Sequence, residues 1–197
     1  MDLELFKTTR DFAIEYGTVL GVIWIATFFT FMSGITGGNI LLMMFSMGFM
    51  GLTVIFPIYL AWRYKQHLNK AGDRVPFGIA WLFTILMFFY ASVITGAGEF
   101  LYFQYMDQGK FLDFFMRFLS SPETEAQYQM MGASDFLEKS RVQLQELVNL
   151  TPLDITLNLF VNNIFVSLLY SPIVATVAHR KCRMLTVQNM YKTQKNQ

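Results

Sequence analysis

The sequence predicts an all-α integral membrane protein with four transmembrane helices and a small extracytoplasmic helical cap between helices three and four. Composition is the first observation: only 15% of the 197 residues are charged and 54% are hydrophobic, whereas soluble domains carry about 25% charged residues. The second observation is where charges are missing. Asp, Glu, Lys, Arg and His are absent between Glu15 and Arg63, between Arg74 and Glu99, and between Asp154 and His179. Each charge-free segment is long enough for at least one helix of about 20 apolar residues.

The first charge-free segment has room for two helices, and its SGITGG stretch (33–38) supplies the turn between them. The other two segments hold one helix each. We therefore expect transmembrane helices near 13–33, 39–62, 77–98 and 153–178, within a single membrane domain that covers 1–197. A soluble helical bundle is a poor alternative, because LLMMFSMGFMGLTVIFPIYLAW has no polar stripe to face water.

The distribution of basic residues predicts the orientation. With four spans, eleven Lys and Arg fall on the side that holds both termini, and four fall on the other side. The residues of the second group all lie in the long segment between helices three and four: Lys110, Arg117, Lys139 and Arg141. Positive charge is enriched in cytoplasmic loops, so we expect both termini in the cytoplasm and this segment outside.

The outer segment, 107–151, carries helix signals of its own and predicts a cap. KFLDFFMRFL (110–119) places its charges on one face and its Phe and Leu residues on the rest, as in a helix that lies in the headgroup layer. Ser121 before Pro122 is typical of a helix N-terminus, and Gly132 of a stop. A further helix is expected from Ser134 to about Val148.

The last transmembrane helix has a local start signal. The residues Thr151-Pro152-Leu153-Asp154 form a variant of the capping box, in which an aspartate takes the place of the usual glutamate.

Glu99 is open to two interpretations. Counted from Phe77 at about 1.5 Å per residue, it falls at the outer interface, where a carboxylate facing water is the simpler interpretation. The alternative is a polar pocket between helices three and four that binds a cation, a proton or a cationic group. Its other members would be Asp154, Asn158 and Asn162, which recur every four residues on one face, with Asn163 beside them. Without a ligand, these amides would instead join helices by hydrogen bonds.

Smaller features predict packing rather than chemistry. Gly17 and Gly21 form a Gly-x-x-x-Gly pair that allows another helix to approach closely. Pro57 and Pro172 interrupt helices two and four in their cytoplasmic halves, where they bend or loosen the helix.

The sequence offers no catalytic, cofactor or metal signature, so we expect a protein that is not an enzyme. It lacks a phosphate-binding glycine loop, an H-E-x-x-H motif and a G-x-S-x-G motif. His179 and Cys182 supply two ligands at helical spacing, whereas a closed zinc site takes four. A net charge of only +1 also argues against binding to nucleic acid.

Several stretches together resemble one known family. They are FAIEYGTVLGVI at the first helix, ITGAGEFLYFQYMD after the third, FLDFFMRFL followed by YQMMG, and a fourth helix that starts at Thr-Pro and has a basic exit. In these respects the chain resembles the bacterial membrane family catalogued as domain of unknown function 4199, over nearly its whole length. The resemblance implies a four-helix protein of the bacterial inner membrane, and no activity or site residues. The turn after the third helix is typically Asp-Pro in this family, whereas here it is Asp107-Gln108-Gly109. This departure leaves the start of the cap open.

Two functions remain in view. The first is a non-enzymatic interaction or assembly component, which would work through its cap and helix faces on a second copy of the chain or on other membrane proteins. The second is a small transporter or channel component with the polar pocket described above. In both, the lipid bilayer is the surrounding medium.

Overall fold

The computed structural model describes residues 3–70, 75–147 and 150–179. These residues form seven α-helices and one short π-helix, with no strand among them: α1 (Leu3–Gly37), α2 (Ile40–Lys70), α3 (Phe77–Tyr102), the π-helix η1 (Phe103–Asp107), α4 (Lys110–Leu119), α5 (Pro122–Met130), α6 (Ser134–Leu147) and α7 (Pro152–His179).

Four of these helices are long and apolar enough to cross a membrane: α1, α2, α3 continued by η1, and α7. The predicted number of spans is confirmed, and all four helices are longer than predicted. The first begins at Leu3 rather than near 13, and the third continues through η1 to Asp107 rather than ending near 98. The physical reason is that absence of charge marks only the part of a helix that lies in lipid. A helix satisfies its own backbone hydrogen bonds and continues into water when its sequence allows it.

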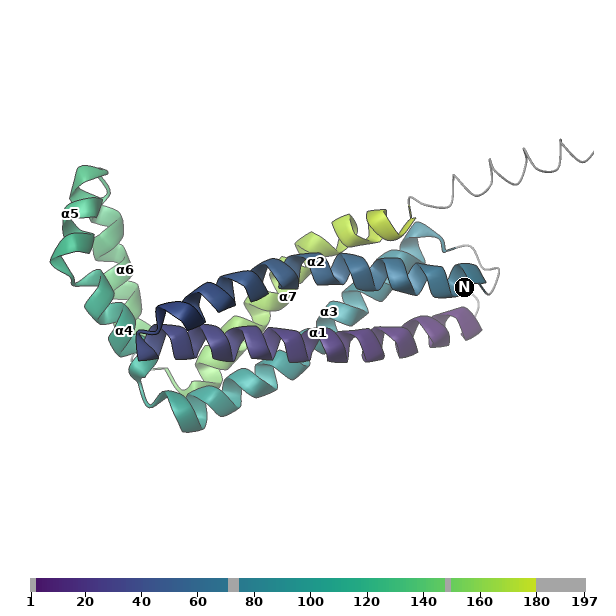
Figure 1. The fold of residues 1–197 in the computed structure, drawn as a ribbon, viewed down its shortest axis with the longest axis horizontal. Coiled ribbons are helices and arrows are strands. Elements are labelled where there is room, and N and C mark those ends of the chain that lie inside the picture. The colour runs from purple at the N-terminus through teal and green to yellow at the C-terminus, as the bar shows by residue number, and fades with distance from the viewer. Residues whose placement is uncertain (1–2, 71–74, 148–149, 180–197) are drawn as a thin grey trace, which may run out of the picture.

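The four long helices form a bundle with the cap at one end (Figure 1). Helix α1 packs against α2 and α3, while α7 packs against α3 and α2. The N-terminus and the end of α7 lie at the end opposite the cap (Figure 1). This arrangement agrees with an even number of membrane crossings by the long helices.

Close packing of α1 on α3 depends on glycine. A Cβ atom added at Gly17 would lie 2.6 Å from the Met87 carbonyl oxygen, and one at Gly21 would lie 2.9 Å from Ile94 Cβ. The two glycines that the sequence assigned to close helix approach therefore lie directly against α3. The main-chain atoms of α3 occupy the space that a larger side chain would need.

The end of the bundle away from the cap is filled by a continuous apolar core. Its largest buried side chains include Tyr64 and Phe83, whose rings stack with centroids 3.9 Å apart. The Tyr64 hydroxyl is hydrogen-bonded to Thr9 Oγ1 at 2.8 Å, so that this buried polar group is satisfied.

The cap follows the local signals closely. The Ser121 hydroxyl accepts a hydrogen bond from the Thr124 N–H at the start of α5, and Gly132 has a φ of +65° just after α5 ends. The Arg141 guanidinium of α6 donates to the Leu119 carbonyl at 2.8 Å and so joins α6 to the end of α4. Val148, placed in the predicted second cap helix, lies outside the described residues.

The turn into the cap uses a buried aspartate. Asp107 ends the π-helix, and its carboxylate accepts hydrogen bonds from the N–H groups of Gly109 and Phe111. Gln108 and Gly109 both have positive φ angles, 50° and 82°. The departure from Asp-Pro is thus accommodated by a left-handed turn, after which α4 begins at Lys110.

Candidate functional site

Glu99 lies inside the protein, with only 5% of its surface exposed. The simpler interpretation, in which this carboxylate meets water at the membrane boundary, is therefore wrong. Glu99 sits on α3 among residues of α1 and α7 rather than at a helix end.

Two facts explain the burial. Helix α3 does not end at Glu99, because the chain continues in helical form for eight residues to Asp107, roughly 12 Å along the axis. An aromatic cluster also lies between Glu99 and the cap, with Tyr102 and Phe103 buried against Met32. Aromatic residues after a carboxylate are typical of a membrane interface, but here they pack on neighbouring helices.

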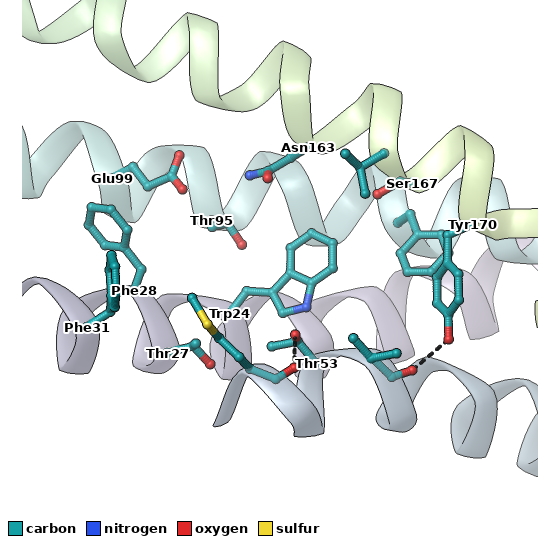
Figure 2. Close-up of a pocket in the computed structure, with 14 residues that line it drawn as sticks. Trp24, Thr27, Phe28, Phe31, Thr53, Thr95, Glu99, Asn163, Ser167 and Tyr170 are labelled. Carbon is teal, nitrogen blue, oxygen red and sulfur yellow. Dashed lines mark hydrogen bonds between the residues drawn. The ribbon is translucent and has the colours of Figure 1, made fainter. Parts of the chain in front are cut away.

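Glu99 belongs to a pocket of about 440 Å³ that is lined by residues of all four long helices. Figure 2 shows α1 and α2 along one side of the pocket and α3 and α7 along the other. Its lining is mostly apolar and aromatic, with a few hydroxyl and amide groups: Trp24, Thr27, Phe28 and Phe31 from α1; Met50, Thr53 and Val54 from α2; Phe88, Thr95 and Glu99 from α3; and Asn163, Val166, Ser167 and Tyr170 from α7. Such a mixture is typical of small-molecule sites.

Two polar atoms in this lining are buried without a hydrogen-bonding partner among the described residues. They are Oε2 of Glu99 and Nε1 of Trp24. The Asn163 amide of α7 is the polar side chain that interacts with the Glu99 carboxyl, on the same side of the pocket (Figure 2). Buried polar atoms nearly always have partners in native proteins, so one free acceptor and one free donor in the same cavity indicate a place for a ligand.

The pocket is closed at both ends. On the cap side, the rings of Phe28 and Tyr102 pack edge to face at 5.2 Å within the aromatic cluster. On the other side, the Tyr170 hydroxyl donates a 2.8 Å hydrogen bond to the Val54 carbonyl and joins α7 to α2 (Figure 2). Beyond this contact lies the apolar core.

On the cap side of the Tyr170 contact, the seam between α2 and α7 is open to the surroundings of the bundle. Three lining side chains on these helices are about half exposed: Met50 at 46%, Val54 at 54% and Val166 at 54%. In a membrane this side faces lipid.

The structure does not assemble the predicted set of polar residues. Only Glu99 lines the pocket. Asp154 accepts hydrogen bonds from the Thr151 N–H and hydroxyl at 3.0 and 2.6 Å, which caps α7 as the sequence predicted. Asn158 is exposed and donates to the Asp154 carbonyl of its own helix, and Asn162 is exposed on the bundle surface.

Sequence reasoning placed Asn163 beside the polar face and did not assign Trp24 to the candidate pocket. Asn163 follows Asn162 by one residue, which turns it about 100° around the helix, toward α3 instead of away from it. Because α7 is apolar nearly all round, its pattern alone does not tell which face meets protein. For Trp24, the one available signal was an indole N–H within a membrane segment, where a partner is expected.

The site is poorly suited to a metal ion. Among the described residues, no group of three or more His, Cys, Asp or Glu comes together. Calcium takes six to eight oxygen ligands, whereas Glu99 is the only carboxylate in the pocket lining. Of the two possible ligands His179 and Cys182 that the sequence offers, Cys182 lies outside the described residues.

The fold and the pocket define a class: a multi-pass membrane protein whose described residues are helical, with a mostly apolar pocket inside its bundle that holds a few polar groups. Within that class, the chain belongs to the family described as "Protein of unknown function (DUF4199)", which matches residues 15–180. No curated protein and no solved structure matches the chain.

Proposed function

We propose that the protein binds a small molecule within the bilayer and serves as a component of membrane transport. One observation carries this proposal: in the part of the chain that the structure describes, Glu99 Oε2 and Trp24 Nε1 are buried without hydrogen-bonding partners in the same cavity of about 440 Å³. Leaving such groups unsatisfied costs stability, and a ligand with a donor and an acceptor removes that cost.

The position of the pocket favours transport over simple storage. Binding sites of many transporters lie between helices near the middle of the membrane. Here the hydrogen bond from Tyr170 to the Val54 carbonyl closes the end away from the cap, and prolines lie close to it on both helices, Pro57 on α2 and Pro172 on α7. A proline interrupts the hydrogen bonds of a helix, and the helix bends there. We therefore expect the pocket to open at the contact between Tyr170 and Val54, toward the side of the membrane away from the cap.

A pocket-filling substitution tests the binding function. Ser167 is buried in the lining, whereas the next residue, Leu168, is exposed outside it. Native mass spectrometry of protein released from membranes in mild detergent should show wild type and Leu168→Phe carrying a bound small molecule at near one-to-one ratio. Ser167→Phe should lose it. Equal ligand content in both variants, or none in wild type, would contradict the proposal.

We further propose that the protein resides in the bacterial inner membrane with both termini in the cytoplasm and the cap outside. The bias of basic residues supports this orientation, together with the position of the cap opposite the N-terminus (Figure 1). A cysteine at the exposed Glu125 should react with an impermeant maleimide in cells with a permeable outer layer. The native Cys182, in the tail outside the described residues, should stay unlabelled; the reverse pattern would invert the orientation.

Assembly with other membrane proteins is a second candidate function. The observation that favours it is an apolar patch on the cap, where Met130, Met131 and Phe136 are all largely exposed and the Phe136 ring stacks on Tyr128. Exposed apolar patches mark contact sites. A photo-reactive residue at Met130 should capture a protein in native membranes, while one at the exposed Gln127 should not. Recovery of a solitary monomer in both cases would count against assembly through the cap.

A further inference from the structure

We infer that the ligand of this pocket is an amphiphilic amine that enters from the lipid phase. Its protonated amino group lies at Glu99, and its apolar body extends between α2 and α7. This inference rests on the proposed binding function and adds the chemical class of the ligand.

The route of entry follows from which sides of the pocket are closed. The aromatic cluster of Phe28 and Tyr102 covers the cap side, and the Tyr170 contact with α2 covers the opposite end. The remaining side, between Met50 of α2 and Val166 of α7, is exposed and apolar. A molecule that reaches the pocket through this side crosses lipid first, so it must itself dissolve in a membrane.

The charge of the ligand follows from the lining. Glu99 is the only acidic side chain of the pocket lining, and the lining holds no Lys, Arg or His that could balance a charge on it. An isolated carboxylate is costly to bury unless a cation or strong donors compensate it. Asn163 supplies an amide on one side, and Oε2 of Glu99 has no hydrogen-bonding partner among the described residues. A cation with an N–H group satisfies Glu99 Oε2 with a charge-assisted hydrogen bond.

The aromatic rings favour an organic cation over a metal ion. Trp24, Phe28, Phe31, Phe88 and Tyr170 supply five rings to the lining. Ring faces attract ammonium groups, most strongly where water is excluded, but they supply none of the oxygen ligands that hard metal ions require. An aliphatic amine is protonated at neutral pH, as the lysine side chain is.

The free indole N–H adds a second point of recognition. Figure 2 shows Trp24 across the pocket from Glu99, on the side toward Thr53 and Tyr170. A ligand that satisfies both groups carries its amine at one position and an oxygen acceptor farther along its body. This pair of contacts gives the amphiphile a fixed direction in the pocket.

Four ten-carbon amphiphiles test the inference: decylamine, decyltrimethylammonium, decanol and decanoate. Full-length protein in phosphatidylcholine nanodiscs would be titrated with each by calorimetry, and empty nanodiscs would be subtracted. We expect saturable binding of decylamine about tenfold tighter than that of decanol, the usual scale for one charge-assisted hydrogen bond. Decanoate should bind more weakly than decanol.

Two carboxylate variants make the comparison specific. Glu99→Gln keeps the shape of the side chain and should reduce decylamine binding to the level of decanol. Glu15→Gln removes the same charge from an exposed position of α1 and should behave as wild type. The comparison between decylamine and decanol on wild type does not depend on either variant and stands even if Glu99→Gln fails to fold.

The outcomes separate this inference from the proposed function. Equal saturable binding of decylamine and decanol would overturn the inference and leave the binding function standing. No saturable binding of any of the four amphiphiles would also overturn the inference, and the binding function would then be decided by the native mass spectrometry of wild type and Ser167→Phe. Binding of decyltrimethylammonium as tight as that of decylamine would overturn the requirement for an N–H donor. If Glu99→Gln kept the preference for decylamine over decanol, Glu99 would not be the group that recognises the amine.

Discussion

Replacing Gly17 by alanine should separate the two most closely packed helices of the bundle. The added Cβ would lie 2.6 Å from the Met87 carbonyl oxygen and 2.8 Å from Tyr90 Cβ on α3. A main-chain oxygen cannot turn aside as the end of a flexible side chain can. The clash can be relieved only by moving α1 away from α3.

The size of the effect follows from these distances. Restoring an ordinary contact of 3.4 Å requires a shift of roughly 0.8 Å between the two helices. Overpacking of this kind costs about 1–3 kcal/mol, and alanine recovers up to about 1 kcal/mol because it favours the helix more than glycine does. We expect a net loss of about 1–2 kcal/mol, which lowers the melting temperature of a chain of this size by roughly 2–8 °C.

Gly48 provides the matched control for this substitution. It lies within α2, and a Cβ atom there would meet nothing within 4 Å. Thermal unfolding of purified protein in one detergent, followed by circular dichroism, should show Gly17→Ala melting below wild type. Gly48→Ala should melt at or slightly above wild type. Equal melting temperatures for the two variants would refute the close approach of α1 and α3.

Two further substitutions test one hydrogen bond from the body of α7 to α2 and one at the start of α7. Tyr170→Phe removes the donor to the Val54 carbonyl and should lower the free energy of unfolding by about 0.6 kcal/mol, the average for such bonds between membrane helices. If both the melting temperature and the ligand content stayed unchanged, this contact would not close the pocket. Thr151→Val removes the hydroxyl that bonds with Asp154 and should cost about 1 kcal/mol in thermal unfolding, as lost N-caps do. Thr176→Val, on the exposed surface of the same helix, is its control and should cost less; an equal loss in both would argue against the capping box.

The sequence by itself determined the number of spans and the helices of the cap, because both depend on local signals. Charges are excluded from hydrocarbon wherever they occur in a chain, so their absence marks the four spans. Caps act within a few residues, and the Ser121 and Thr151 hydroxyls bond as their positions predict. Because these signals are local, the sequence did not predict how far α1 and α3 extend beyond their apolar segments. A helix that continues into water loses its hydropathy signal while its backbone remains helical.

The tertiary structure alone decided which polar groups form a site. Residues Asp154, Asn158 and Asn162 share the regular spacing that a polar face requires, yet the structure uses the first as a cap and leaves the other two exposed. The pocket instead joins Glu99 of α3 to Trp24 of α1, which are 75 positions apart in the chain. In a soluble helix the polar face shows which side meets water and which meets the core. Lipid is as apolar as a protein core, so in a membrane helix the side that faces its neighbours is set by how the helices pack on one another.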